Sequence, residues 1–190
     1  HAPEQTAPSE SSARALVKEN RAYNSAYLRS KGNSMPEDTD RPMRVFLCHT
    51  SKDKPVIRKL YRFLRKNGID AWLDEEKLLA GQDWQVEIPK ALKESDAILV
   101  CLSNHSITKE GFVQKEIKYA LDIADEKPEG TIFIIPVLLE KCEVPERIAR
   151  WHWVEAFSER GGEKLIRSLS RRAETLGLAI SRAPLPDAAL

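Results

Sequence analysis

The stretch from Ala97 to Ala120 decides the fold, and it reads AILVCLSNHSITKEGFVQKEIKYA. Its first six residues are all apolar, which predicts a buried strand of a parallel sheet. A polar loop follows, and then a predicted helix with apolar residues at helical spacing. These residues are Val113, Ile117, Ala120, Leu121 and Ala124. A buried strand, a loop and an amphipathic helix together form the repeating unit of an α/β fold.

Glu116 lies in the first turns of that predicted helix and has no basic neighbour three or four residues away. It is therefore a carboxylate without a local ion partner, close to the carboxyl end of a buried strand. Open α/β sheets bind their ligands at that end. An acid near a helix N-terminus also favours the helix dipole by about 0.3–1 kcal/mol. Position alone therefore leaves a functional and a purely structural explanation open.

The rest of the chain repeats the same alternation of strand and helix. Further strands are expected over residues 43–48, 69–73, 131–139 and 151–155, with Pro136 marking a sheet edge or a bulge. Helices are expected from Ser51 or Asp53 to the cap at Gly68, from Trp84 onward, over 144–150 and over 162–176. This alternation predicts a flavodoxin-like, doubly wound parallel sheet of five strands in the order 2-1-3-4-5.

In that strand order the first and third strands lie side by side at the switch point, where ligands bind. The residues that follow them are His49-Thr50-Ser51 and Ser103-Asn104, which we expect to converge with Glu116 on one crevice. The segment from Asp74 to Asp83 follows the second strand, and we expect it to be a long polar loop with a hinge at Gly81.

The first predicted helix has two contrasting sides. Its expected core residues are Val56, Ile57, Leu60, Phe63 and Leu64. Its basic residues, Arg58, Lys59, Arg62, Arg65 and Lys66, lie mostly on the other side. Such a face either holds a partner or is simply solvated, and the sequence leaves both explanations open.

Length and charge bound the possible functions. The 190 residues suit one domain with tails: a tail with a possible short helix and a linker over 1–42, a domain over 43–177, and a C-terminal tail over 178–190. With 30 basic and 29 acidic side chains the net charge is +1, which predicts no general attraction to nucleic acid or membrane surfaces. No apolar run is long enough to span a bilayer, and no secretory signal is apparent. The chain begins at His1 without a methionine, so we expect the natural protein to extend upstream.

The three cysteines are an odd number, and Cys48 and Cys101 fall inside predicted core strands. Buried free thiols indicate a reducing compartment, so a cytoplasmic location is expected. No Cys/His spacing supports a metal site, so none is predicted.

Three segments resemble, in order, the signature boxes of the Toll/interleukin-1 receptor (TIR) domain. They are RVFLCHTSKD (44–53), GIDAWLDEEKLLAG (68–81), and Leu102-Ser103 followed by Phe112-x-x-x-Glu116. The resemblance runs from Met43 to Leu176 and is strongest to the bacterial and enzymatic branch, whose members cleave the N-glycosidic bond of NAD. In that branch the catalytic glutamate follows an aromatic residue, usually Trp, by four positions. The resemblance therefore implies that Glu116 is catalytic and that Phe112 walls the pocket without an indole N–H.

The resemblance also implies roles for other residues. Thr50, Ser51 and Leu79 fall at positions that contact the dinucleotide, and the full set of expected substrate contacts is His49, Thr50, Ser51, Leu79, Trp84, Ser103 and Phe112. For Trp84, an anchor in the core is an equally good explanation. The loop from Asp74 to Asp83 resembles the BB loop of the family, which implies roles in NAD access and in assembly. Its expected assembly residues are Asp74, Glu75, Glu76, Lys77, Leu78 and Gly81.

A single carboxylate suits the implied reaction. O-glycosidases need a second carboxyl group to protonate the departing oxygen, whereas nicotinamide leaves NAD+ already neutral. An ionised Glu116 would hydrogen-bond the ribose hydroxyls and stabilise the oxocarbenium-like transition state. NAD+ is then the substrate, and no cofactor is expected.

Two functions remain open at this stage. The first is an NAD+ glycohydrolase that self-associates, with other TIR domains and an upstream sensor domain as partners in a defence or signalling pathway. The second is a non-catalytic TIR scaffold that acts only by assembly, as a homo-oligomer or filament. A phosphoacceptor receiver domain shares the sheet order but needs acidic residues where this chain has His49, Thr50 and Ser103.

Overall fold

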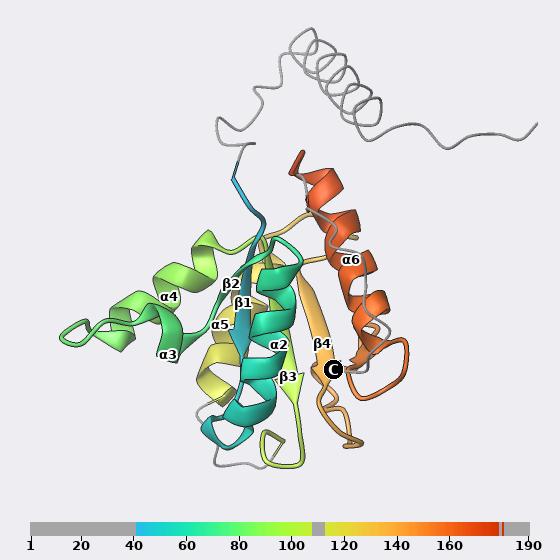
Figure 1. Ribbon diagram of the computed structural model, residues 1–190, viewed down its shortest axis with the longest axis horizontal. Helices are drawn as coiled ribbons and strands as arrows, with labels where there is room; N and C mark the ends of the chain where they lie inside the picture. Colours follow the sequence, from blue (N-terminus) through green and yellow to red (C-terminus); the bar gives the residue numbers. More distant parts are fainter. Residues whose placement is uncertain (1–40, 108–112, 179, 181–190) are drawn as a thin grey trace, which may run out of the picture. The chain divides into compact units, whose positions relative to one another are not determined.

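The computed structural model describes residues 41–107, 113–178 and 180, which fall within one compact unit, Asp40–Leu190 (Figure 1). Side chains are described up to Ile107 and again from Ile117. The predicted N-terminal tail and linker therefore lie almost entirely outside the described residues, as does most of the predicted C-terminal tail.

Five parallel strands form one sheet in the order β2-β1-β3-β4-β5. They are β1 (Arg44–Cys48), β2 (Asp70–Trp72), β3 (Ala97–Leu102), β4 (Ile134–Leu138) and β5 (Val154–Glu155). This order confirms the predicted flavodoxin-like α/β fold. All six residues of β3 are buried, which explains why that strand is apolar throughout rather than alternating.

Helices cover both faces of the sheet. They are η1 (Ser51–Asp53), α2 (Lys54–Lys66), α3 (Asp74–Lys77), α4 (Trp84–Glu94), α5 (Val113–Asp125) and α6 (Gly161–Thr175). Because successive strand residues point to opposite faces, the sheet supplies two cores. Val45, Leu47 and Leu99 pack with α2 and α6 in one core. Phe46, Ile98 and neighbouring strand residues pack with α4 and α5 in the other.

The expected core stripe of α2 is wrong at one position. Ile57, Leu60 and Leu64 are buried as predicted, whereas Val56 is 41% exposed. Ile57 already occupies the sheet side of the helix, and a residue one position earlier is rotated by about 100° around the axis. Val56 therefore points towards solvent.

Two expected elements differ from the structure. The segment after β2 is not all loop, because Asp74 to Lys77 form the short helix α3. Residues 144–150 are not a helix but a turn, in which the Pro145 carbonyl accepts hydrogen bonds from the N–H groups of Ile148 and Ala149. The bonds that follow, from the Ala149 N–H to Glu146 and from the Trp151 N–H to Ile148, span only three residues, so no α-helix develops. A segment this short seldom sustains a helix, because helix nucleation is unfavourable.

Pro136 does not mark a sheet edge, because β4 lies between β3 and β5. The Leu138 carbonyl accepts the Ala156 N–H, so the backbone N–H and C=O groups of even-numbered residues in β4 are directed towards β5. The β5 pairing begins only opposite Val137. The Pro136 nitrogen, which has no hydrogen to donate, therefore lies opposite the chain that precedes β5. No hydrogen bond of the β4–β5 ladder is lost.

Within the described part of the chain, no helix combines the length and the apolar character needed to cross a membrane.

Candidate functional site

The carboxyl ends of β1 and β3 lie side by side, and a buried hydrogen bond joins the segments that follow them. Ser103 is the first residue after β3, and its Oγ donates to Asp53 Oδ2 at 2.7 Å. Asp53 is 7% exposed and Ser103 only 2%. The bond spans 50 positions of sequence and fixes the start of α2 to the end of β3.

The same serine closes the loop after β3. Its Oγ accepts the N–H groups of His105 and Ser106, both at 3.2 Å, and its own N–H donates to Ser106 Oγ at 2.7 Å. Outside this turn, the Asn104 N–H and side-chain amide donate to Glu140 Oε1 at 2.8 and 3.0 Å. Ser103 is thus engaged within the protein, and its hydroxyl is not free to meet a ligand in this conformation.

His49 is also buried at this edge. Its Nδ1 lies 3.1 Å from the Leu47 carbonyl oxygen, to which the tautomer with a proton on Nδ1 donates a hydrogen bond. Its Nε2 lies 3.7 Å from Asp74 Oδ1, a buried oxygen with no hydrogen-bond partner among the described residues. At 3.7 Å the two atoms are too far apart for a direct hydrogen bond.

The thiols near this edge are protonated at neutral pH. Burial raises the pKa of Cys101 far above its usual range, and the nearby Asp53 charge raises it further. Burial, followed by the charges of Glu140 and Asp53, also raises the pKa of Cys142. Since the thiolate is the reactive form, neither cysteine offers a nucleophile.

Thr50 and Ser51 follow β1 and are open to ligands to different degrees. Thr50 is half-buried, and its carbonyl accepts the Asp53 N–H at 3.0 Å. Ser51 is exposed at the start of η1. The structure therefore leaves the Ser51 side chain accessible at the edge where the sequence predicts dinucleotide contact.

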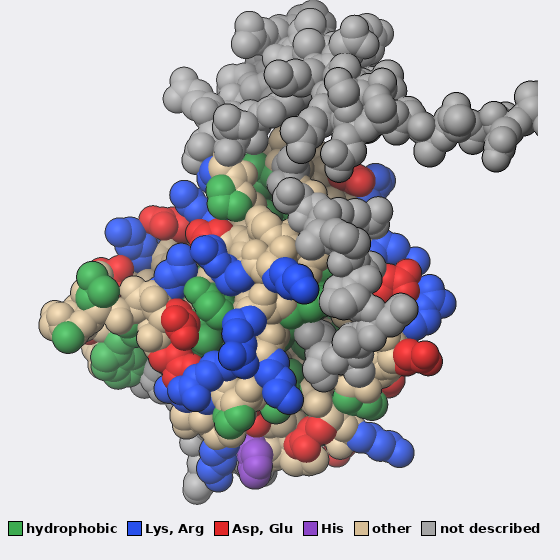
Figure 2. Space-filling view, viewed as in Figure 1, with side chains coloured by type: hydrophobic (Ala, Val, Ile, Leu, Met, Phe, Trp, Pro, Cys, Tyr) green, Lys and Arg blue, Asp and Glu red, His purple; other side chains and the backbone are tan. Residues whose placement is uncertain are grey.

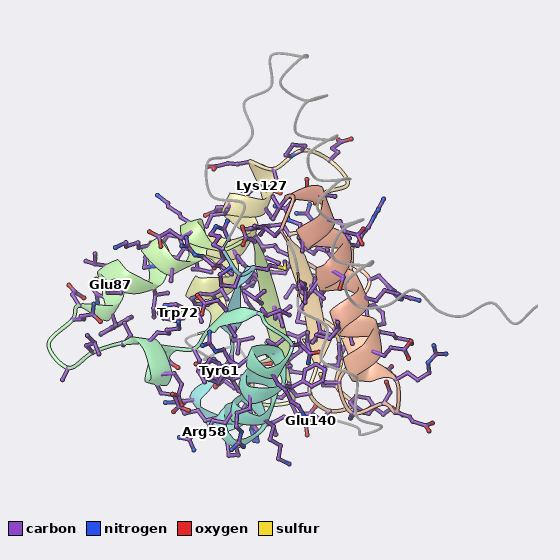
Figure 3. The ribbon with its side chains drawn as sticks, turned by 45° about the horizontal axis from the view of Figure 1, so that its top comes forward. Arg58, Tyr61, Trp72, Glu87, Lys127 and Glu140 are labelled. Atoms are coloured by element: carbon purple, nitrogen blue, oxygen red, sulfur yellow. The ribbon has the colours of Figure 1, made fainter. Side chains whose placement is uncertain are left out.

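The segment after β2 is held at its base and open at its tip. In α3, Glu75 pairs with Arg58 and Lys54 of α2, and the hydrogen bond from Arg58 is the main cause that lowers the pKa of Glu75. The Arg58 end of this pair lies near the carboxyl edge of the sheet. Figure 3 shows Arg58 and Glu140 towards one end of the domain and Lys127 towards the other. Arg58 and Glu140 belong to the carboxyl edge, because they follow β1 and β4 closely.

The tip of this segment carries exposed apolar side chains. Leu79 is 71% exposed and Trp84, the first residue of α4, is 45% exposed. Trp84 is therefore not a core anchor, which removes one of the two explanations for it. Gly81 lies between them at φ 93°, a backbone conformation that favours glycine. Lys77 reaches back to Asp70 at 2.9 Å, and Leu78 is half-buried after α3.

Glu116 belongs to α5, which begins three residues earlier at Val113. The direction of its side chain lies outside what the structure describes, and so does Phe112 altogether. The predicted convergence of Glu116 on the β1–β3 edge therefore remains a prediction.

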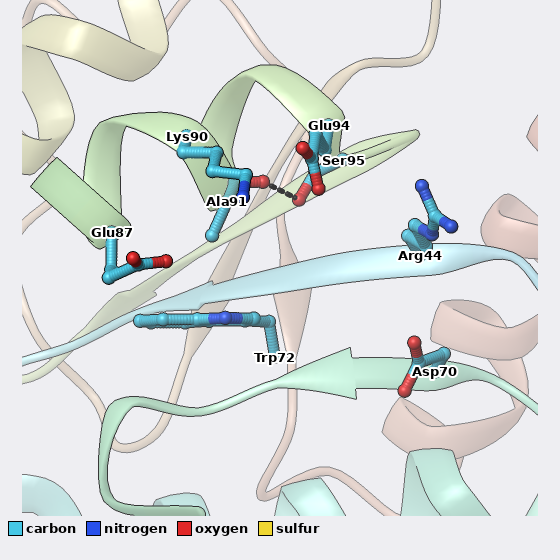
Figure 4. A pocket seen from close by; sticks show the side chains of 8 residues that line it. All are labelled: Arg44, Asp70, Trp72, Glu87, Lys90, Ala91, Glu94 and Ser95. Carbon is cyan, nitrogen blue, oxygen red and sulfur yellow. Dashed lines mark hydrogen bonds between the residues drawn. The ribbon is translucent and has the colours of Figure 1, made fainter. Parts of the chain in front are cut away.

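A hollow of about 240 Å³ lies elsewhere, between the edge strand β2 and α4 (Figure 4). Its lining residues are Arg44, Asp70, Trp72, Glu87, Lys90, Ala91, Glu94 and Ser95. The Trp72 ring stacks on Phe46 with centroids 4.7 Å apart, so the indole forms a rigid wall. The sequence did not predict this hollow, because its lining comes from residues distant in the chain.

Sequence reasoning missed the central role of Asp53. An aspartate before a helix suggests a cap, yet no side-chain capping bond forms, and the carboxylate accepts from Ser103 instead. The local pattern contained no signal for a partner 50 residues away. Among the described side chains, no group of three or more His, Cys, Asp or Glu residues is arranged to bind a metal ion.

Comparison with known proteins agrees with this architecture. The sequence profile of the family described as "TIR domain" matches residues 45–169, well over half of the chain. The chain belongs to the TIR domain family. This TIR domain is 33% identical over 94 residues to a protein of Theionarchaea archaeon (strain DG-70-1) named NAD(+) hydrolase TcpA. That match covers 49% of this chain and 27% of the archaeal protein, so the chain spans about a quarter of that relative.

A solved structure of another TIR domain shares the fold. The TIR domain of the Toll-related receptor TRR-2 from Hydra magnipapillata superposes with a TM-score of 0.56 at 21% identity, over 68% of this chain and 97% of that chain. The TIR domains of the activated Roq1 resistosome give a TM-score of 0.44 at 20% identity, over 71% of this chain and 81% of theirs.

Proposed function

We propose that this TIR domain cleaves the nicotinamide–ribose bond of NAD+, giving nicotinamide and either ADP-ribose by hydrolysis or cyclic ADP-ribose by cyclisation, and that self-association activates it. The observation that carries the proposal is the 33% identity over 94 residues to a protein named as an NAD(+) hydrolase. The presence of Glu116 four residues after the aromatic Phe112 supports it.

In the proposed mechanism Glu116 is ionised and accepts hydrogen bonds from the hydroxyls of the nicotinamide-side ribose. Its negative charge stabilises the positive charge that develops on the ribose as the bond to nicotinamide breaks. Nicotinamide leaves as a neutral molecule, so no general acid takes part. A water molecule then attacks the ribose and loses a proton to solvent, which gives ADP-ribose. If the adenine of the same substrate attacks instead, the product is cyclic.

The described residues contribute support and access in this mechanism. The Asp53–Ser103 bond holds the segment of Thr50 and Ser51 against the loop that leads into α5. Ser51 is accessible for a hydrogen bond to the dinucleotide. Leu79 and Trp84 carry exposed apolar surface on the segment around Gly81, where a ring of the substrate or a neighbouring domain would pack.

The test is nicotinamide release from NAD+ across a range of protein concentrations. Wild-type protein should release nicotinamide, and Glu116→Gln should reduce the rate by at least about a hundredfold, because it removes the charge that stabilises the transition state. Glu159→Gln, which changes an exposed carboxylate after β5, is the matched control and should keep wild-type activity.

Two outcomes would contradict the proposal. A Glu116→Gln variant with half of the wild-type rate would remove Glu116 from the mechanism. Wild-type protein that assembles but releases no nicotinamide would favour the alternative function, a TIR scaffold that acts only by assembly.

A further inference from the structure

The outer face formed by α2 and α6 carries a concentrated positive charge. Both helices pack on the same side of the sheet. The α2 sequence, KPVIRKLYRFLRK, holds six basic residues and no acidic ones, and the α6 sequence, GGEKLIRSLSRRAET, holds four basic and two acidic ones. The whole chain has 30 basic and 29 acidic side chains, so 20 and 27 remain outside the two helices. The near-neutral net charge therefore conceals a strong asymmetry.

Much of this charge is not compensated within the domain. Lys54, Arg58 and Arg65 have ion partners on neighbouring segments. No such partner exists among the described residues for a second group, all of them exposed. Its members are Lys59, Arg62, Lys66, Lys164 and Arg167. We call these five residues the basic face. Figure 2 shows Lys and Arg side chains gathered over α2.

The spacing of the basic face is unfavourable for an isolated domain. Lys59, Arg62 and Lys66 are separated by three and four positions. In α6, Lys164 and Arg167 are three positions apart. Like charges at these spacings destabilise a helix by about 0.2–0.5 kcal/mol per pair. Two copies cannot pair through this face alone, because like charges would then oppose each other. A partner of this face must be negatively charged.

The chain offers such a surface at the C-terminal end of α5. Asp122 and Asp125 lie in the last turn of that helix, Glu126 and Glu129 follow, and all four are exposed. We call these four residues the acidic end. The last turn of α5 contains no basic residue, although a helix C-terminus carries partial negative charge and favours cations. The acidic end is therefore locally unfavourable, as the basic face is.

Compensation of the acidic end inside the domain is slight. Asp125 pairs with Arg150 at 3.0 Å, and the other three carboxylates have no ion partner among the described residues. The one lysine between them, Lys127, lies 5.2 Å from the centroid of the Phe133 ring. Three carboxylates at a helix C-terminus thus remain available to an external cation.

We propose that the basic face of one copy docks on the acidic end of a second copy. The helices that carry the two surfaces cover opposite faces of the sheet, since α2 and α6 belong to one core and α5 to the other. A contact between different surfaces is heterologous, so it extends to an open chain of molecules unless the rotation between copies closes a ring. This inference rests on the self-association in the proposed function, names the surfaces involved, and is independent of NAD+ cleavage.

Charge reversal of each surface tests the docking. One variant carries Lys59→Glu, Arg62→Glu and Lys66→Glu, and a second carries Asp122→Lys, Glu126→Lys and Glu129→Lys. Each should self-associate at least about tenfold more weakly than wild type in sedimentation velocity at low salt. A third variant that combines all six changes restores complementarity and should recover association. Lys90→Glu, Lys93→Glu and Lys141→Glu, which make the same charge change at exposed sites elsewhere, form the matched control and should associate as wild type does.

Mixing provides a second readout. The first variant carries two negative surfaces and the second carries two positive ones, so neither should associate with itself. An equimolar mixture should associate, with the two variants alternating along the assembly. Higher salt should weaken the wild-type association, because the contact is electrostatic.

Three results would overturn the inference. They are a wild-type protein that stays monomeric at all concentrations, a six-change variant that does not recover association, and a basic face that binds a short DNA duplex while its reversal leaves self-association unchanged. Nicotinamide release is measured separately, so failure of the docking does not imply failure of the proposed hydrolysis.

Discussion

The Ser103 hydroxyl donates to the Asp53 carboxylate at 2.7 Å, and both side chains are almost completely buried. The bond joins the first residue after β3 to the residue before α2, and therefore ties together the two loops at the switch point of the sheet. A buried carboxylate that loses its hydrogen-bond donor destabilises the folded state, whereas an exposed carboxylate can accept from water instead. The pair is thus a structural element of the edge where this fold binds ligands.

Ser103→Ala should lower the free energy of unfolding by about 1–3 kcal/mol, because it leaves the Asp53 carboxylate buried without its donor. Ser103→Thr retains a hydroxyl and should lose less. Urea unfolding measures both. Ser168→Ala, which removes a hydroxyl that donates to the Lys164 carbonyl on the solvent side of α6, is the control and should change stability by under about 0.5 kcal/mol. Equal losses for Ser103→Ala and Ser168→Ala would show that the buried bond contributes nothing special.

The Arg58–Glu75 pair should make stability depend on pH. The pKa of Glu75 is lowered in the folded protein, chiefly by its hydrogen bond from Arg58. A lowered pKa means that the stabilisation is present above the pKa of the unfolded chain and disappears as the pH falls through the folded value. Wild type should therefore be more stable than Glu75→Gln at neutral pH, and the difference should vanish in acid. Unfolding midpoints measured from pH 7 to pH 3 check this, with Glu76→Gln as the control. If wild type stays more stable than Glu75→Gln in acid as well, the difference comes from packing and not from the charge of Glu75.

Gly81→Val should suppress NAD+ cleavage while the domain remains folded. Gly81 has φ 93°, and a Cβ there would meet nothing within 4 Å, so the obstacle is backbone strain and not a clash. Strain of this kind costs about 1–3 kcal/mol and should shift the loop away from its present conformation. The readout is initial rate against enzyme concentration. Gly130→Val, at φ 77° with similar open space, matches the strain and controls for the loss of stability. Unchanged kinetics in Gly81→Val would show that the loop conformation does not matter for catalysis.

Phe112→Ala should reduce kcat/KM for NAD+, and Phe112→Trp should keep or improve it, because an aromatic wall acts through stacking and packing. The measurement is steady-state kinetics beside urea unfolding of each variant. If Phe112→Ala lowers the unfolding midpoint and leaves kcat/KM intact, Phe112 packs in the core and does not line the site.

The sequence alone determined the class of fold. The apolar run of β3 and the alternation of strand and helix predicted a parallel sheet in the order that the structure has, because periodicity and burial are properties of short segments. The three signature boxes of the TIR domain were likewise identified from the order of residues within short segments. The profile match over residues 45–169 confirms the family. The spacing between Phe112 and Glu116 belongs to this class of information and led to the catalytic prediction.

Tertiary structure decided which side chains are partners. Asp53 looks like a helix cap in the sequence, but packing of β3 beside β1 brings Ser103 to its carboxylate. Pro136 predicts a sheet edge, but it lies inside the sheet without the loss of a hydrogen bond because the pairing with β5 begins only at Val137. The basic face likewise appears only when α2 and α6, about a hundred residues apart, cover the same side of the sheet. Local periodicity sets each element, whereas contacts between distant elements depend on how the buried faces pack together, which no short pattern encodes.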